Sequence, residues 1–184
     1  MKQLIIVFSV WSAFFCLLPA ENIPSRSQPD IMIKFQSFSA KNLNDVVITV
    51  PDPVSPRVEV AVLTFARQDL EQTDSWINTF TSLYKGNTNP VYCEVAVTGD
   101  IPVIGGLIFN GIKNSLPKDK WDRFLIFTGD KEKLSKNLMV DNAALFYIYV
   151  IGRDGTIKWS LKAPLATDAL IKEMLNAVKK ELSY

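Results

Sequence analysis

Residues 60–76, "VAVLTFARQDLEQTDSW", join an apolar run to an amphipathic one through a turn rich in acids and amides. In the longer run 57–65, "RVEVAVLTF", apolar residues fill nearly every position from Val60 onward, which is typical of a strand covered on both faces. After the turn, apolar residues recur at helical spacing, and Thr73 or Asp74 can cap the helix. The stretch therefore predicts a central strand that leads directly into a helix.

The rest of the chain alternates between the same two kinds of element. Two short strands are expected first, in "DIMIKFQSFS" (30–39) and "DVVITV" (45–50), forming a hairpin. After residues 60–76, which we call the joint, the sequence predicts an inner strand at 91–97, a helical or irregular apolar segment at 101–117 and a strand within 121–130. A short helix at 131–138 and a strand at 144–151 follow. The tight turn "GRDG" at 152–155 then leads into a strand at 156–161, and a helix at 167–182 closes the chain.

This order, two parallel units followed by an antiparallel hairpin and a closing helix, resembles the thioredoxin-like arrangement. The expected fold is α/β, with a central mixed sheet flanked by helices and an N-terminal β-hairpin. The segment "FYIYVIGRDGTIKWSLKAPLATDALIKEMLNAVKK", together with "QPDIMI", "LPKDKWDRFLIF" and the joint, resembles the ATP-ten family of mitochondrial ATP synthase assembly factors. The resemblance spans roughly residues 29–182 and rests on the order and spacing of these pieces. It implies a thioredoxin-like protein without a redox cysteine pair.

The first twenty residues differ from the family pattern. "MKQLIIVFSVWSAFFCLLPA" has one basic residue, an apolar run and a proline before its final alanine, which is the layout of an export signal. The run is short for a membrane span, so cleavage after Ala20 is expected rather than permanent anchoring. We therefore expect a signal peptide at 1–20, a polar tether at 21–29 and one thioredoxin-like domain at 30–184. The expected location is the periplasm or cell envelope.

Composition excludes several kinds of chemistry. The 184-residue chain has no histidine, which removes Ser-His-Asp and Cys-His catalysis and the usual ligands of zinc. Without the leader, basic and acidic residues balance, so nucleic-acid binding is disfavoured. No nucleotide motif is present, and we predict neither a cofactor nor a metal site.

Cys93 is the only cysteine outside the leader, and it lies within the predicted inner strand "VYCEVAV". Burial there would raise the pKa of its thiol, so we expect a structural role. The joint itself offers acids and amides where a redox enzyme of this fold carries its nucleophile. Near Phe146, where redox-active relatives place a cis-proline, the chain reads "NAALFY". The nucleophile and the clamp for the substrate peptide are thus both missing.

The sequence therefore predicts an exported, non-catalytic binding protein or assembly factor that aids a membrane complex. The expected partner is a protein, either membrane-embedded or not. The sequence does not predict the oligomeric state. Candidate contacts are Arg67 and Asp69 in the joint, Phe109 in the apolar segment and Trp159 at a strand end, although packing is the simpler role for Trp159. The alternative hypothesis is a one-cysteine thiol peroxidase or oxidoreductase that uses Cys93.

Overall fold

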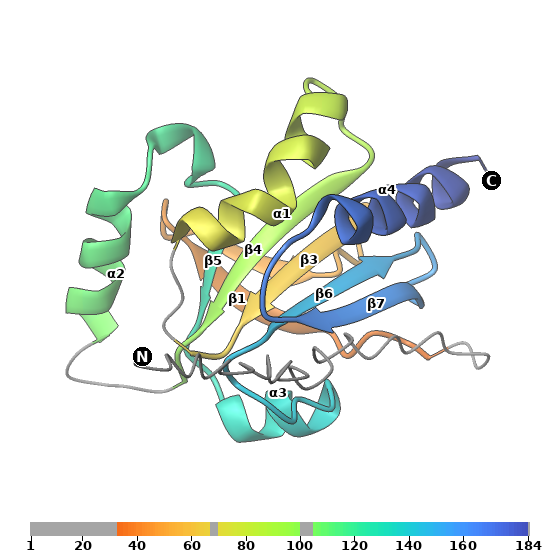
Figure 1. Cartoon of the computed structure of the whole chain (residues 1–184). Coiled ribbons are helices and arrows are strands. Elements are labelled where there is room, and N and C mark those ends of the chain that lie inside the picture. Colours follow the sequence, from red (N-terminus) through yellow and green to blue (C-terminus); the bar gives the residue numbers. More distant parts are fainter. Residues whose placement is uncertain (1–32, 67–69, 100–104, 184) are drawn as a thin grey trace, which may run out of the picture.

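The computed structural model describes residues 33–66, 70–99 and 105–183 (Figure 1). These residues build one mixed seven-stranded sheet with the strand order β2-β1-β5-β4-β3-β6-β7. The strands are β1 (Phe38–Asn42), β2 (Val47–Val50), β3 (Glu59–Thr64), β4 (Val91–Val97), β5 (Phe124–Phe127), β6 (Phe146–Ile151) and β7 (Ile157–Ala163). The helices are α1 (Leu70–Leu83), α2 (Gly105–Ser115), the 3-10 turn η1 (Lys118–Lys120), α3 (Lys131–Asn137) and α4 (Asp168–Leu182).

Strand pairing confirms the predicted topology. Strand β3 runs parallel to β4, and β4 runs parallel to β5. Strand β6 pairs with β3 and β7 pairs with β6, both antiparallel. The chain thus has the two parallel units, the antiparallel hairpin and the closing helix of a thioredoxin-like protein.

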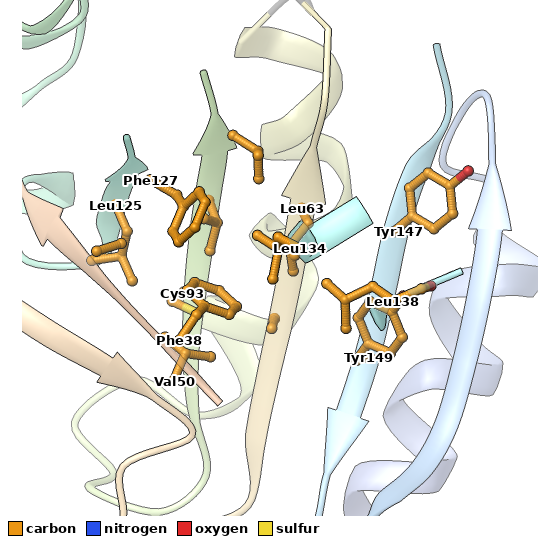
Figure 2. Close-up of a cluster of buried hydrophobic side chains, with 14 of the residues drawn as sticks. Phe38, Val50, Leu63, Cys93, Leu125, Phe127, Leu134, Leu138, Tyr147 and Tyr149 are labelled. Carbon is orange, nitrogen blue, oxygen red and sulfur yellow. The ribbon is translucent and has the colours of Figure 1, made fainter. Parts of the chain in front are cut away.

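The central strands are buried on both faces, as their apolar runs predict, and each face has its own core. Helices α1 and α4 cover one face, where Trp76, Phe80 and Met174 are fully buried. Helix α3 covers the other face through Leu134 and Leu138 (Figure 2). A third, smaller cluster forms around Leu43, Leu116, Phe124 and Ile126, beneath α2.

Helix starts agree with the sequence at one end of the chain and differ at the other. The Thr167 side chain accepts a hydrogen bond from the Leu170 N–H and caps α4, as the predicted start at residue 167 requires. Helix α1 begins at Leu70, so Thr73 and Asp74 lie within its first turns and neither is the N-cap. The prediction of a cap at Thr73 or Asp74 is therefore wrong.

The N-terminal hairpin is present, but its first strand lies later than expected. Strand β1 begins at Phe38, and β1 and β2 pair antiparallel. Before it, Lys34 forms an isolated antiparallel bridge with Thr156, and the Phe35 N–H donates to the Gly155 carbonyl. Residues 33–35 therefore attach to the beginning of β7, at the far edge of the sheet from β2.

Candidate functional site

The joint between β3 and α1 has the predicted form of a strand that leads into a helix. Strand β3 ends at Thr64, the buried Phe65 follows, and α1 begins at Leu70. The candidate contacts Arg67 and Asp69 lie outside the described residues, so their role stays a prediction. What the structure describes at this end of the sheet is the set of side chains around Phe65.

Two elements hold the end of β3 in place. The Lys131 ammonium, at the start of α3, donates a hydrogen bond to the Phe65 carbonyl. The Phe65 ring packs edge-on against Tyr147 of β6, with 5.6 Å between ring centroids. The end of β3 is thus held by an aromatic contact and by a lysine that already has an acceptor.

Tyr147 also organises the loop that precedes β6. Its hydroxyl donates to the Asp141 carboxylate at 2.9 Å and accepts from the Asp141 and Asn142 backbone N–H groups. Lys162 of β7 forms an ion pair with the same carboxylate, and its hydrogen bond lowers the pKa of Asp141. The cis peptide bonds among the described residues are Val50–Pro51 and Asn89–Pro90, so none stands at Phe146.

Cys93 lies in the core on the α3 face of the sheet. Figure 2 shows Cys93 among the buried apolar side chains of this face. Its Sγ donates a hydrogen bond to Glu59 Oε1 at 3.4 Å. Burial, followed by the nearby Glu59 carboxyl, raises the pKa of the Cys93 thiol well above its ordinary value. Burial likewise raises the pKa of Glu59. Both groups are therefore driven toward their neutral forms.

The position of Cys93 in its strand also separates it from the joint. Cys93 is opposite Ala61 in the β3–β4 register, and Thr64 lies three residues further along. At about 3.3 Å per residue, the thiol is roughly 10 Å short of the end of β3 where the joint begins. The expectation of burial for Cys93 is confirmed: its sulfur has no open surface. The charge of Arg123 lowers the pKa of the thiol, but burial and the acids Glu59 and Glu94 outweigh it.

Phe109 of α2 is half-buried and packs on the third core cluster. The Lys113 ammonium lies over two rings, 5.7 Å from the Phe109 centroid and 4.6 Å from the Trp121 centroid. The Trp121 indole N–H donates to the Leu116 carbonyl at 3.1 Å. Phe109 is therefore both a packing residue and a partly accessible one.

Leu107 is the most exposed large apolar residue among the side chains of α2 that the structure describes. It shares a helical spacing with Ile112 and Leu116, a stripe that can either pack on the sheet or meet a partner. Ile112 and Leu116 pack into the third cluster. Leu107, in contrast, is 73% exposed, so α2 presents this leucine to solvent.

Trp159 is a core residue. It is buried with Met174 and Val178 of α4 on the α1–α4 face of the sheet. Its ring is not available at the surface of this structure, so we do not retain it as a contact residue.

The sequence reasoning missed two buried acids, Glu59 and Glu94. Glu94 is on β4 and only 2% exposed, and its burial raises the pKa of its carboxyl to about 7. Asp74 and Lys120, which form an ion pair, are its charged neighbours in the described chain. The available signal was the presence of an acid inside each of two strands that are covered on both faces.

A mostly apolar groove of about 240 Å³ was also not predicted. Its walls are the N-terminal described segment at Ile33, the residues Leu138 and Met139 that follow α3, and the strands β6 and β7. Within the described residues, no group of three or more His, Cys, Asp or Glu side chains could hold a metal ion. None of the helices in the described segments has the length and apolar character that a membrane crossing requires.

Comparison with solved structures finds the same architecture in other proteins. The chain is similar to yeast Sco1, with a TM-score of 0.56 and 15% identity over 80% of this chain and 95% of that one. BsSco, described as a member of the Sco family of cytochrome c oxidase assembly proteins, gives 0.53 and 11% over 79% and 94%. A thiol-disulfide oxidoreductase from Bacteroides fragilis NCTC 9343 gives 0.54 and 15% over 78% and 98%. At these identities the likeness shows the thioredoxin-like fold.

Comparison with curated protein sequences gives no match. The sequence model of the ATP10 protein family, in contrast, matches residues 28–180. The match includes both edges of the sheet, the joint and most of the closing helix. The chain therefore belongs to the ATP10 protein family.

Proposed function

We propose that this protein is an exported, non-catalytic binding protein that assists the assembly of a membrane complex. The observation that carries the proposal is the state of Cys93, a buried thiol that donates to a carboxyl whose own pKa is raised. Sulfur nucleophiles react as thiolates, and this environment opposes thiolate formation. We infer that the protein acts by binding a partner through its surface.

Family membership supports an assembly role. The resemblance noted above implies a factor for ATP synthase assembly, and BsSco is described as belonging to a family of assembly proteins for another membrane enzyme, cytochrome c oxidase. The apolar leader at residues 1–20 supports export to the periplasm or cell envelope. A membrane-embedded subunit of the complex is the partner that fits both features.

The contact surface that we propose is the outer side of α2. Leu107 is largely exposed, and Gly111, one turn further along the helix, adds no side chain that would shield it. Phe109 lies on the side that packs on the third cluster and is half-exposed at its border, so it is a second proposed contact rather than a neighbour of Leu107. A large apolar side chain open to solvent is a candidate anchor for a partner. Arg67 and Asp69 of the joint are a third proposed contact.

The test uses cells of the source organism that lack this protein and are complemented with the full chain. The readout is the amount of assembled ATP synthase on native gels. Leu107→Asp should reduce assembly to the level of cells without the protein, because it places a charge in the contact surface. Val54→Asp is the matched control, since Val54 is 90% exposed but lies outside α2, and it should assemble normally.

Cys93→Ala separates this function from the thiol-enzyme alternative. If the protein acts by binding, Cys93→Ala supports assembly as well as the unaltered chain at equal protein level. Normal folding with complete loss of assembly in Cys93→Ala would overturn the non-catalytic proposal.

A further inference from the structure

Among the described residues, the outer edge of β2 has no neighbouring strand. The Asn42 N–H donates to the Val46 carbonyl at 2.9 Å, so the backbone groups of Val46, Ile48 and Val50 point inward to β1. Those of Val47 and Thr49 point outward. Within residues 33–66, 70–99 and 105–183, no partner for these outward N–H and C=O groups is found.

This edge is short and is followed by Pro51, but it carries no charged side chain. Edge strands are commonly blocked by small length, proline, lysine, inward-pointing charges or bulges. Residues 46–50, "VVITV", carry no charge and are all β-branched, and Val47 is 60% exposed. The flanking acids are already paired, Asp45 with Lys41 at 2.8 Å and Asp52 with Arg57 at 3.4 Å. A strand that adds here meets no unpaired flanking carboxylate.

We infer that two copies of this chain associate by antiparallel pairing of their β2 edges about a two-fold axis at Ile48. In this register Val47 of each copy is opposite Thr49 of the other, and each such pair exchanges both of its N–H···O bonds. Ile48 then faces its own copy in a pair without hydrogen bonds. The two seven-stranded sheets become one continuous sheet.

The strand itself argues for a second copy as the occupant. The register centred on Ile48 matches both outward-facing residues of each strand with outward-facing residues of the other. A shift by two residues in either direction places Pro51, which has no N–H, or Asp45, at the hairpin turn, opposite an outward position. No like charges meet in the centred register, which is the condition for a self-complementary interface.

The length of β2 sets the strength of this association. Four residues give a small contact, well below the interface area of stable dimers, so the pair forms reversibly. A covalent trap placed on the two-fold axis is therefore the suitable test.

The test introduces single cysteines into the full chain, in which Cys16→Ala removes the leader thiol and the buried Cys93 is kept. Ile48→Cys places the two sulfurs in a pair whose Cα atoms are about 4.5 Å apart, within the range of disulfides. Val47→Cys places them diagonally, at about 7–8 Å, where a disulfide does not form without backbone movement. Cells that express each variant are treated with a mild thiol oxidant, and dimers are measured on non-reducing gels.

The order of cross-linking decides between pairing and random collision. Collision follows exposure, so it predicts most dimer for Val54→Cys, then Val47→Cys, and least for the half-buried Ile48→Cys. The proposed register predicts the reverse, with Ile48→Cys forming the most dimer. Continued protection of Cys93 from a maleimide shows that each variant is folded.

A charge exchange in the Ile48→Cys chain tests the register independently. Val47→Lys with Thr49→Lys places like charges opposite each other and should reduce the disulfide dimer about fivefold. Val47→Lys with Thr49→Glu places opposite charges there and should restore it. If Ile48→Cys cross-links no more than Val54→Cys, or if both charge variants behave alike, the β2 pairing is wrong.

Discussion

Burial and Glu59 together keep the Cys93 thiol from ionising. Both side chains are buried, and desolvation is the largest cause of the raised pKa of each. A negative charge on either group would also raise the cost of ionising the other, 3.4 Å away. The thiol can donate its proton to the carboxyl as a hydrogen bond, but the pair does not favour a reactive thiolate.

Glu94 makes a testable contribution to the pH dependence of stability. Burial raises the pKa of its carboxyl from 4.5 to about 7 in the folded chain. Between these values the folded state binds more protons than the unfolded state, so the free energy of unfolding falls as pH rises through this window. The loss attributable to Glu94 is on the order of 3 kcal/mol by pH 8. Urea unfolding at a series of pH values measures it.

Glu94→Gln is the control for that measurement. The amide does not ionise, so the variant should lose much less stability between about pH 5 and 8 than the unaltered chain. Glu59 still contributes in the same direction, because its pKa is also raised, and a smaller slope should therefore persist. Identical pH profiles for the two chains would show that Glu94 is not held protonated by the fold.

At the scale of the element, the apolar residues Leu107 and Phe109 of α2 have different roles. Phe109 packs on the third core cluster, whereas Leu107 is open to solvent. Phe109→Asp should lower the free energy of unfolding by about 2 kcal/mol, through lost packing and a partly buried charge. Leu107→Asp should change it by less than about 0.5 kcal/mol. Equal destabilisation by the two substitutions, measured in urea, would place Leu107 in the core.

Helical periodicity predicted α1 and α4 and left the segment at 101–117 as helical or irregular, and it could not place every side chain of α2. The spacing of Leu107 with Ile112 and Leu116 is real, but only the latter two reach the small cluster over β5. Figure 1 shows α2 set apart from the layer formed by α1 and α4. How far a helix extends beyond its sheet is a tertiary property that a periodic pattern does not encode.

The start of α1 shows a similar limit. Polar residues able to cap a helix follow one another through the joint, so the pattern indicates a helix without fixing its first residue. The closing helix was predictable because a clear apolar period follows Thr167, whose side chain does cap α4. Asp168 beside it could also cap a helix, so the apolar period rather than the capping residue located this helix.

At the scale of the whole molecule, the central place of β3 and the two parallel units followed from the sequence, because apolar runs and their spacing determine which strands are central. The place of the N-terminal hairpin beside β5 did not follow from it. The contacts between buried polar side chains could not be predicted from the sequence. Glu59 and Cys93 come from different strands, and only the β3–β4 register brings them together. The sequence predicted that Cys93 would be buried, but it did not reveal which group its thiol would contact.

The reactivity of Cys93 in the folded protein tests the central claim most directly. The full chain with Cys16→Ala has this cysteine as its only thiol, and labelling with a maleimide at neutral pH can be followed before and after unfolding in urea. A thiol that is buried and paired with Glu59 should stay unlabelled while the chain is folded and react fully once it unfolds. Rapid labelling of the folded chain, at a rate close to that of the unfolded chain, would contradict a scaffold without sulfur chemistry.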